Sequence, residues 1–215
     1  MTHAEPAGGR ITSGGPVTGP LPAGFGVVID PGTKQVDEDT LFGGAPARVL
    51  RLSRTGRAAL AELRAGPVRS DAAGRLARKL TDTGLAHPRP PALNSRPDVT
   101  VLIPVRDRAV LLGRCLAALG DSYPVLVVDD GSEDPGSVAA VAAAHGAALV
   151  RRPVNGGPGA ARNTGLCNVT TDLVAFLDSD CVPGPGWIER LAAHLPDPIV
   201  AAVAPRMVAV PGGPG

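Results

Sequence analysis

The pattern of apolar and polar positions changes partway along the chain. In its first part, GFGVVIDPGTKQV and PARVLRLS are short apolar runs around a Pro-Gly turn, and they predict strands. RTGRAALAELRAG and SDAAGRLARKLTDTG then show helical spacing. Ser53 and Ser70 are suited to N-cap these helices, and Gly84 to follow the second one. The first part is therefore predicted to be a β-hairpin followed by two helices.

Beyond a proline-rich segment, strands and helices are predicted to alternate. VTVLIPV, YPVLVVDDGS, AALVRRP and DLVAFLDSD have the length and apolar character of buried strands. The segments between them, AVLLGRCLAALG, PGSVAAVAAAHG and GPGAARNTGLCNV, read as helices. Short connections of this kind require right-handed crossovers, so the fold class is predicted as α/β with a mainly parallel sheet.

These changes divide the chain into four predicted regions. Residues 1–20 are rich in Gly, Pro, Ser and Thr and are expected to form a disordered tail. Residues 21–88 form a small α+β domain, residues 89–97 a linker, and residues 98–215 the α/β domain. Residues 1–96 carry 13 basic and 8 acidic side chains, and the remainder carries 8 and 12. This asymmetry indicates that the two domains have different tasks.

Composition excludes several functions. Aromatic residues make up only 2% of the chain, which leaves little to stack on bases, so no nucleic-acid partner is expected. VAAVAAAHGAALV, the longest apolar run, is too short to span a membrane, and the N-terminus has no apolar signal region. Cys115, Cys167 and Cys181 lack metal-site spacing and are odd in number, which argues against zinc and disulfides. A cytoplasmic location is predicted.

The chemistry is concentrated at the ends of the predicted strands. Three polar clusters occur there: Pro104 to Asp107, Asp129 to Ser132, and Asp178 to Asp180. In an open parallel sheet, ligands bind outside the carboxyl ends of the strands, so these clusters are expected to share one edge. Taken singly, each cluster is also what a strand-end turn uses to satisfy its backbone.

Asp178 and Asp180 are separated by a single serine. In an extended backbone, both carboxylates would project to the same side. Two such charges about 4 Å apart repel by roughly 4 kcal/mol at an effective dielectric constant near 20. A hard divalent ion, Mg²⁺ or Mn²⁺, would relieve the repulsion while also binding the phosphates of a substrate.

NGGPGAARNTG places glycines and Arg162 at a helix start, where an anion could bind. A dinucleotide-binding fingerprint fits poorly, because the segment follows the third strand and Arg162 stands at the third glycine position. The sequence has neither a GxxxxGK[ST] loop nor a GxSxG elbow. Arg151 and Arg152, just upstream, are expected to be solvated.

Together, VLIPVRDR, VLVVDDGSED, RPVNGGPGAARNTGL and LVAFLDSDCVPGPGW resemble the motifs of family 2 glycosyltransferases with the GT-A fold. The resemblance implies a Rossmann-like half-domain that binds a nucleotide-diphospho-sugar, and it covers about residues 98–210. The family implies that Pro104 and Asp107 line the base pocket, that Asp129 lies near the ribose or base, and that Asp130 contacts the base edge. It also implies that Arg162 reaches the nucleotide or diphosphate. Asp178 and Asp180 would hold metal and diphosphate. Trp187 would pack the next helix or cover the site.

The family also implies transfer with inversion, which needs a carboxylate base to deprotonate the acceptor hydroxyl. The resemblance places that base, with a Q-x-x-R-W motif, downstream of this chain, so no catalytic residue is assigned here. The 215 residues are thus expected to be the N-terminal part of a longer enzyme, with membrane association left to a missing C-terminal region.

Residues 21–88 resemble the small winged-helix elements that recognise precursor peptides in ribosomal-peptide maturation. With the second domain, they resemble the glycosyltransferases of the mycofactocin system, which implies transfer from a UDP-sugar such as UDP-glucose to a peptide-derived, mycofactocin-type redox cofactor. The first domain would then bind an acidic precursor peptide along a sheet edge, or simply pack on the transferase. A peptide-binding adaptor and a nucleotidyltransferase-like enzyme are the alternatives. The sequence lacks the Gly- and Lys-rich loop that is typical of a nucleotidyltransferase, since Lys occurs only at 34 and 79.

Overall fold

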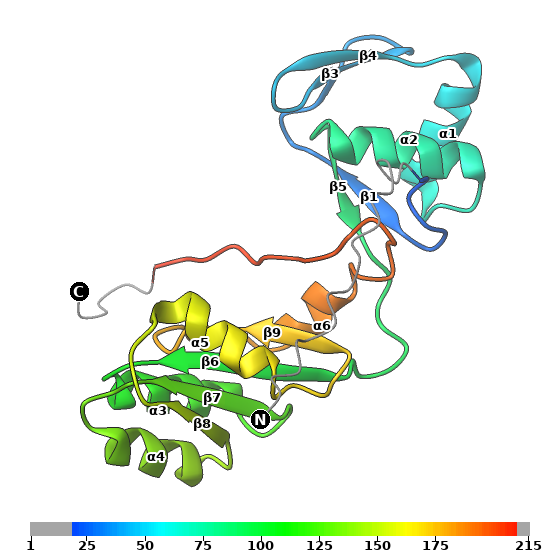
Figure 1. The fold of residues 1–215 in the computed structure, drawn as a ribbon. Coiled ribbons are helices and arrows are strands. Elements are labelled where there is room, and N and C mark those ends of the chain that lie inside the picture. The colour runs from blue at the N-terminus through cyan, green and yellow to red at the C-terminus, as the bar shows by residue number, and fades with distance from the viewer. Residues whose placement is uncertain (1–18, 210–215) are drawn as a thin grey trace, which may run out of the picture. The chain divides into compact units, whose positions relative to one another are not determined.

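The computed structural model describes residues 19–209, and these form two units (Figure 1). The first unit contains the residues up to 91 together with 194–208, and the second is built around 92–193. The break after Pro91 falls inside the predicted linker, whereas the return of 194–208 to the first unit was not predicted. Most of the predicted disordered tail, residues 1–18, lies outside the described residues.

The first unit holds two small antiparallel sheets and two helices. Its elements are β1 (Gly26–Ile29), β2 (Lys34–Gln35), β3 (Thr40–Gly43), β4 (Arg48–Arg51), α1 (Arg54–Ala65), α2 (Asp71–Asp82) and β5 (Ala86–Arg89). Strands β2, β3 and β4 form a meander, while β1 pairs with β5. The predicted hairpin across the Pro31-Gly32 turn is therefore wrong. The partner of β1 follows the second helix, and its sequence AHPR carries little strand signal because it contains proline.

Both helices of this unit begin where the sequence predicted. The Ser53 side chain accepts a hydrogen bond from the Gly56 amide, and the Ser70 side chain accepts one from the Ala73 amide, each at 3.1 Å. Gly84 follows α2 with φ +70°, the left-handed conformation expected after a helix. The helices bury Leu60, Leu63, Ala77 and Leu80 against the β-strands in one hydrophobic core. The likeness to a winged helix remains a prediction.

A buried ion pair joins α2 to the segment 194–208. One terminal nitrogen of Arg78 lies 2.7 Å from both carboxylate oxygens of Asp197, whose side chain is 3% exposed. The Arg78 Nε also donates to the carbonyl of Gly19 at 3.0 Å. Arg78 thus fixes two segments from distant parts of the sequence to one helix.

The second unit is the predicted α/β domain. Its elements are β6 (Val99–Val105), α3 (Ala109–Leu119), β7 (Val125–Asp130), α4 (Pro135–Ala144), β8 (Ala148–Arg152), α5 (Gly157–Leu166), β9 (Leu173–Phe176) and α6 (Trp187–Ala192). The strand order is β8-β7-β6-β9, and every pairing is parallel. The predicted alternation of strands and helices and the parallel sheet are confirmed.

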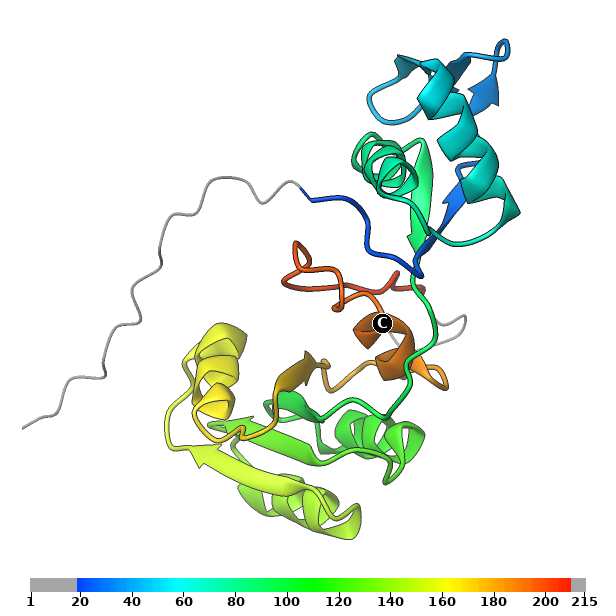
Figure 2. The same cartoon turned by 90° about the vertical axis from the view of Figure 1, so that its right-hand side faces the viewer.

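Helices cover both faces of this sheet, with α3 and α4 on one side and α5 on the other (Figure 2). Every residue of the central strand β6 is buried for this reason. Val101 and Ile103 point into the core that contains α3 and α4, whereas Leu102 points toward α5. The helix α5 comes close because Gly165 faces Leu102, where a Cβ would lie 2.3 Å from a leucine methyl group.

Candidate functional site

The carboxyl ends of all four parallel strands lie along one edge of the second unit's sheet. We call the loops at this edge, residues 105–108, 130–134, 153–157 and 177–181, the rim. The chain passes from β6 to β7 and β8 on one side and then crosses to β9 on the other side of β6. Such a reversal of strand order creates a crevice outside the strand ends, where ligands bind in α/β proteins.

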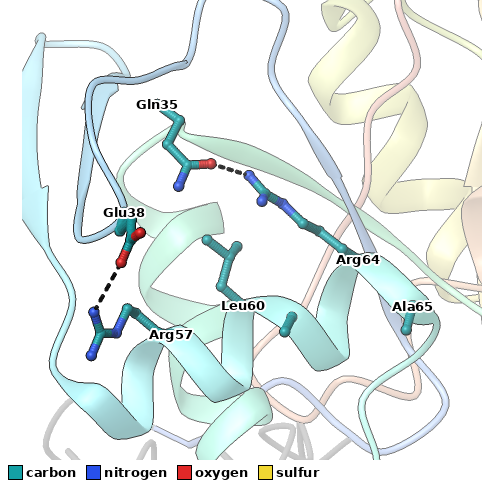
Figure 3. Close-up of a pocket in the computed structure, with 7 residues that line it drawn as sticks. Gln35, Glu38, Arg57, Leu60, Arg64 and Ala65 are labelled. Atoms are coloured by element: carbon teal, nitrogen blue, oxygen red, sulfur yellow. Dashed lines mark hydrogen bonds and ion pairs between the residues drawn. The ribbon is translucent and has the colours of Figure 1, made fainter.

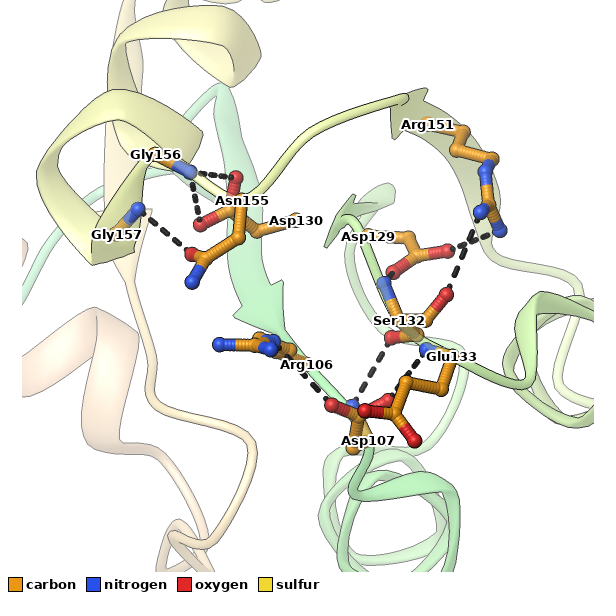
Figure 4. A network of polar contacts seen from close by, with 10 residues as sticks. All are labelled: Arg106, Asp107, Asp129, Asp130, Ser132, Glu133, Arg151, Asn155, Gly156 and Gly157. Carbon is orange, nitrogen blue, oxygen red and sulfur yellow. Dashed lines mark hydrogen bonds and ion pairs between the residues drawn. The ribbon is translucent and has the colours of Figure 1, made fainter.

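Hydrogen bonds join the rim loops after β6 and β7 (Figure 4). The Asp107 amide donates to Ser132 Oγ, and the Ser132 amide donates to Asp129 Oδ1, both at 2.9 Å. The Glu133 amide donates to Asp107 Oδ1 at 2.7 Å. The turn requires Gly131, whose φ is +73° and whose missing Cβ would lie 2.6 Å from the Asn155 amide nitrogen. The structure thus brings the predicted residues Asp107 and Asp129 into one network.

Two arginines at the end of β8 pair with the two aspartates at the end of β7. The parallel register sets Asp129 opposite Arg151 and Asp130 opposite Arg152. The guanidinium nitrogens lie 3.1 Å from Asp129 Oδ2 and 2.7 Å from Asp130 Oδ1, respectively. The prediction that these arginines are merely solvated is therefore wrong. They compensate two carboxylates that are almost fully buried, 1% and 4% exposed.

Asp130 also holds the start of α5. Both of its carboxylate oxygens accept from the Gly156 amide, at 3.1 and 3.2 Å. Its partner Arg152 in turn donates to Thr164 Oγ1 at 2.5 Å and to the Ala160 carbonyl at 3.3 Å. At least one amide that the sequence offered for an anion is therefore used by a carboxylate of the protein itself.

The environment of Asp129 stabilises its charged form. Burial by itself raises the pKa of this carboxyl group, but hydrogen bonds from Ser132 and the guanidinium of Arg151 outweigh that effect. The pKa of Asp129 consequently lies below its ordinary value. Asp129 is thus an anion held in place at neutral pH.

Asp178 and Asp180 lie in a turn after β9. The strand ends at Phe176, and the Cys181 amide donates to the Asp178 carbonyl at 3.0 Å, which closes a four-residue turn. The expectation of an extended backbone through these aspartates is wrong, because the turn begins first. The turn still brings the carboxylates together: single oxygens of Asp178 and Asp180 and the Cys181 sulfur lie within 4.8 Å of one another.

Each of the two carboxylates in this turn forms an ion pair with one arginine. Arg162 contacts Asp178 Oδ1 at 2.6 Å, and Arg108 contacts Asp180 Oδ2 at 2.9 Å. The side chains of Asp178 and Asp180 are 57% and 46% exposed, so both remain open to a ligand. Two converging, accessible carboxylates fit a hard divalent ion that completes its coordination with water and phosphate oxygens.

Cys181 is the third member of this group but a poor partner for such an ion. Burial and the neighbouring carboxylates of Asp180 and Asp178 raise the pKa of its thiol. Burial also raises the pKa of Cys115 to about 12. Protonated sulfur is a weak ligand, and hard ions prefer oxygen, so the two carboxylates are the ligands that matter.

The structure also locates Pro104 and Trp187, the remaining residues to which the sequence gave a role. Pro104 is buried within β6 opposite Val128, immediately before the rim. Trp187 begins α6 and packs against the core of the second unit, in agreement with the packing role. Sequence reasoning missed the contacts of Arg108, Arg151 and Arg152. For the last two, a signal existed: paired acidic and paired basic residues end consecutive strands.

A cavity of about 460 Å³ lies away from the rim, in the first unit (Figure 3). It lies between α1 and the segment that contains β2, and its polar groups already pair with each other. Arg64 donates to Gln35 at 2.7 Å, and Arg57 lies 3.7 Å from Glu38. None of the residues predicted from the sequence to bind the donor lines this cavity.

The rim and the parallel sheet, covered by helices on both faces, define an α/β domain of the GT-A type. The model of the family described as "Glycosyl transferase family 2" matches residues 100–215, and the chain belongs to this family. Over 195 residues the chain is 46% identical to the pre-mycofactocin glycosyltransferase of Mycobacterium tuberculosis, an alignment that covers 90% of this chain. The predicted resemblances to family 2 glycosyltransferases and to the glycosyltransferases of the mycofactocin system are confirmed.

Two further relatives share shorter regions. Glycosyltransferase AglE of Haloferax volcanii is 38% identical over 103 residues, which are 44% of this chain and 34% of that protein. The glucosyl-3-phosphoglycerate synthase of Mycobacterium tuberculosis, solved with Mn²⁺, UDP and glucosyl-3-phosphoglycerate, superposes with a TM-score of 0.40 and 27% identity over 46% of this chain and 39% of its own. The chain spans 41% of the length of the pre-mycofactocin glycosyltransferase. Among residues 19–209, no helix is both long and apolar enough to cross a membrane.

Proposed function

We propose that the second unit binds a nucleotide-diphospho-sugar, with UDP as its nucleotide, for transfer of the sugar to a peptide-derived acceptor of the mycofactocin type. The observation that carries this proposal is the pair of exposed carboxylates, Asp178 and Asp180, at the rim of a family 2 glycosyltransferase domain. The acceptor class follows from the 46% identity to the pre-mycofactocin enzyme. A cytoplasmic location is part of the same proposal.

The proposed roles follow the order of the strands along the rim. Pro104 and Asp107 line the base pocket, and Asp129 and Asp130 lie beside the base and ribose. The support for these roles is that Asp107 and Asp129 share one hydrogen-bonded network. Since Asp130 is 4% exposed and bonded to Arg152, we assign it mainly to the shape of the pocket.

Asp178, Asp180 and Arg162 act on the diphosphate. The two carboxylates would hold Mg²⁺ or Mn²⁺, and the ion would supply positive charge that stabilises the departing diphosphate. Arg162 lies against Asp178 and would donate hydrogen bonds to a phosphate oxygen. Inversion further requires a carboxylate base for the acceptor hydroxyl, and we assign that base to a region outside these 215 residues.

Titration calorimetry with UDP tests donor binding. We expect the wild type to bind UDP at least about tenfold more tightly with Mn²⁺ than without it, because charge-assisted contacts through the ion are then available. Asp180→Ala should lose this dependence on Mn²⁺. Asp121→Ala is the matched control, since this exposed aspartate lies between α3 and β7, at the opposite edge of the sheet. Metal-independent binding by the wild type would refute the metal site.

A transfer assay with UDP-glucose tests the assignment of the base. We expect the 215-residue chain to bind donor yet to transfer sugar weakly or not at all. Sustained transfer by this chain would show that the base lies within it. Failure to bind UDP would instead favour the adaptor alternative.

A second candidate function, binding of an acidic precursor peptide, is favoured by the outer face of the meander. Phe42 lies opposite both Lys34 and Val49 in the strand register, so these three side chains share a face. Phe42 and Val49 are 43% and 62% exposed, and β4 is an edge strand of the three-stranded sheet in the described part of the chain. An extended peptide could add to that edge, with an acidic group near Arg51 of β4.

Fluorescence anisotropy with a labelled mycofactocin precursor peptide tests this second function. Val49→Asp should weaken peptide binding about tenfold or more, because it places a negative charge and removes apolar area on the proposed face. Val28→Asp, on the exposed side of β1, is the matched control and should bind as the wild type does. Equal affinity of the Val49 variant and the wild type would assign the first unit to packing alone.

A further inference from the structure

Arg108 belongs to the loop after β6, yet its side chain contacts the turn after β9. We propose that Arg108 is a donor-binding residue that competes with the divalent ion: it holds Asp180 when no ion is bound and passes to the donor diphosphate when the ion takes its place. This inference rests on the proposed function of Asp178 and Asp180 as metal ligands. It concerns a residue to which neither the sequence motifs nor the resemblance gave a role.

The position of Arg108 supports such an exchange. It is the residue before α3, and the neighbouring Asp107 is anchored by bonds to Ser132 and Glu133. The backbone of Arg108 is thus fixed next to the point where the strand order reverses, between β6 and β9. Its side chain is 57% exposed and is therefore free to change partners.

Arg108 and Arg162, the two arginines that contact the turn after β9, differ in how firmly their side chains are held. The Arg162 side chain is 32% exposed, its Nε is buried, and its guanidinium lies 6.0 Å from the centre of the Phe176 ring. Among residues 19–209, Arg108 is held by one ion pair, its contact with Asp180 at 2.9 Å. An exposed pair of this kind contributes little to stability, so Arg108 is the one that an incoming ion displaces.

Charge balance determines where Arg108 goes. Without the ion, two arginines neutralise two carboxylates that lie within 4.8 Å of each other. A divalent ion adds two positive charges, which makes the vicinity of Asp180 repulsive for a guanidinium. A diphosphate brings negative charge and oxygens that match the fork of an arginine. Arg108 can therefore contribute to nucleotide affinity only in the metal-bound site.

The proposal predicts opposite effects of one substitution on two ligands. In Arg108→Gln, Mn²⁺ alone should bind up to about fivefold more tightly, because its competitor for Asp180 is gone. In saturating Mn²⁺, UDP should bind about tenfold or more weakly, because a charge-assisted contact is lost. A substitution that merely disturbs the loop would weaken both ligands.

Manganese electron paramagnetic resonance measures free Mn²⁺, and calorimetry measures UDP binding in Mn²⁺. The matched control is Arg114→Gln, an exposed arginine on α3, which should leave both affinities at the wild-type values. Arg108→Lys keeps the charge and should restore wild-type Mn²⁺ affinity with only part of the UDP affinity. Thermal unfolding midpoints check that each variant is folded.

The two proposals fail in different ways. If the wild type shows Mn²⁺-dependent UDP binding but Arg108→Gln changes both affinities in the same direction or neither, the role of Arg108 is overturned and the metal site stands. If the wild type binds no Mn²⁺ with or without UDP, both are overturned.

Discussion

Two sets of aspartate–arginine pairs occupy the same rim and differ in burial. Asp129 and Asp130, at the end of β7, are 1% and 4% exposed, whereas the Asp178 and Asp180 side chains are 57% and 46% exposed. A buried charge that loses its partner is strongly destabilising, but an exposed pair can change partners at little cost. The same kind of pair is thus buried at one end of the rim and accessible to a ligand at the other.

The largest effect is expected from Arg152→Ala. Among the described residues it leaves the buried Asp130 with the Gly156 amide as its one remaining partner, which should lower the free energy of unfolding by about 3–5 kcal/mol. Urea denaturation followed by circular dichroism measures this. Arg108→Gln, in the exposed set, should change the same quantity by less than about 1 kcal/mol. Equal losses of free energy of unfolding in the two variants would contradict the distinction between the buried and the exposed set.

Gly131→Ala should have the next largest effect. The added methyl group would meet the Asn155 amide in a backbone conformation with φ +73°, so we expect a loss of about 1–3 kcal/mol in the free energy of unfolding. Gly146→Ala is the control: its φ is +66°, but apart from its chain neighbours no atom of the described residues lies within 4 Å of its added Cβ. The difference between the two variants in urea denaturation isolates the steric contact.

The free energy of unfolding should depend on pH in the acid range because of Asp129, a member of the buried set. Because its folded-state pKa is lowered, its stabilising contribution is present above the unfolded pKa, about 3.9, and is lost as the pH falls through the folded value. We expect the wild-type free energy of unfolding to fall below about pH 4. Asp129→Asn should be less stable at pH 7 and should lose less below pH 4, by on the order of 1 kcal/mol. Parallel curves for the two proteins would contradict a lowered pKa.

The smallest stability effect is expected from Asp178→Asn. Its carboxylate is exposed and its pair with Arg162 is screened by water, so the free energy of unfolding should change by less than about 1 kcal/mol. Its Mn²⁺-dependent UDP binding should nevertheless be lost. A loss of several kcal/mol would place Asp178 with the buried set instead.

The comparison also shows what sequence could predict. The helix starts at Ser53 and Ser70 and the strands of the second unit follow from local signals, that is, capping residues and apolar runs. The pairing of side chains across the sheet does not follow from local signals, because it depends on the register of the strands. Asp129 and Arg151 are neighbours only once β7 and β8 are aligned.

The acidic residues of the candidate site and Arg162 were predictable from the sequence, but its other arginines were not. The aspartates stand at the ends of strands or within a few residues after them, so their positions mark the rim directly. Arg108 follows β6 by three residues and contacts Asp180, which is 72 residues away, and no local pattern encodes that contact. The end of β9 was misplaced for a similar reason, because LVAFLDSD reads as one run, although the turn begins before the aspartates.

The Arg78–Asp197 pair has a consequence for synthesis of the chain. Residues leave the ribosome in order, so α2 and the strands of the first unit emerge long before Asp197 does. Until then Arg78 lacks the carboxylate that compensates it in the finished unit, where that carboxylate is only 3% exposed. The first unit to be made is therefore completed only after the sheet of the second unit has been translated.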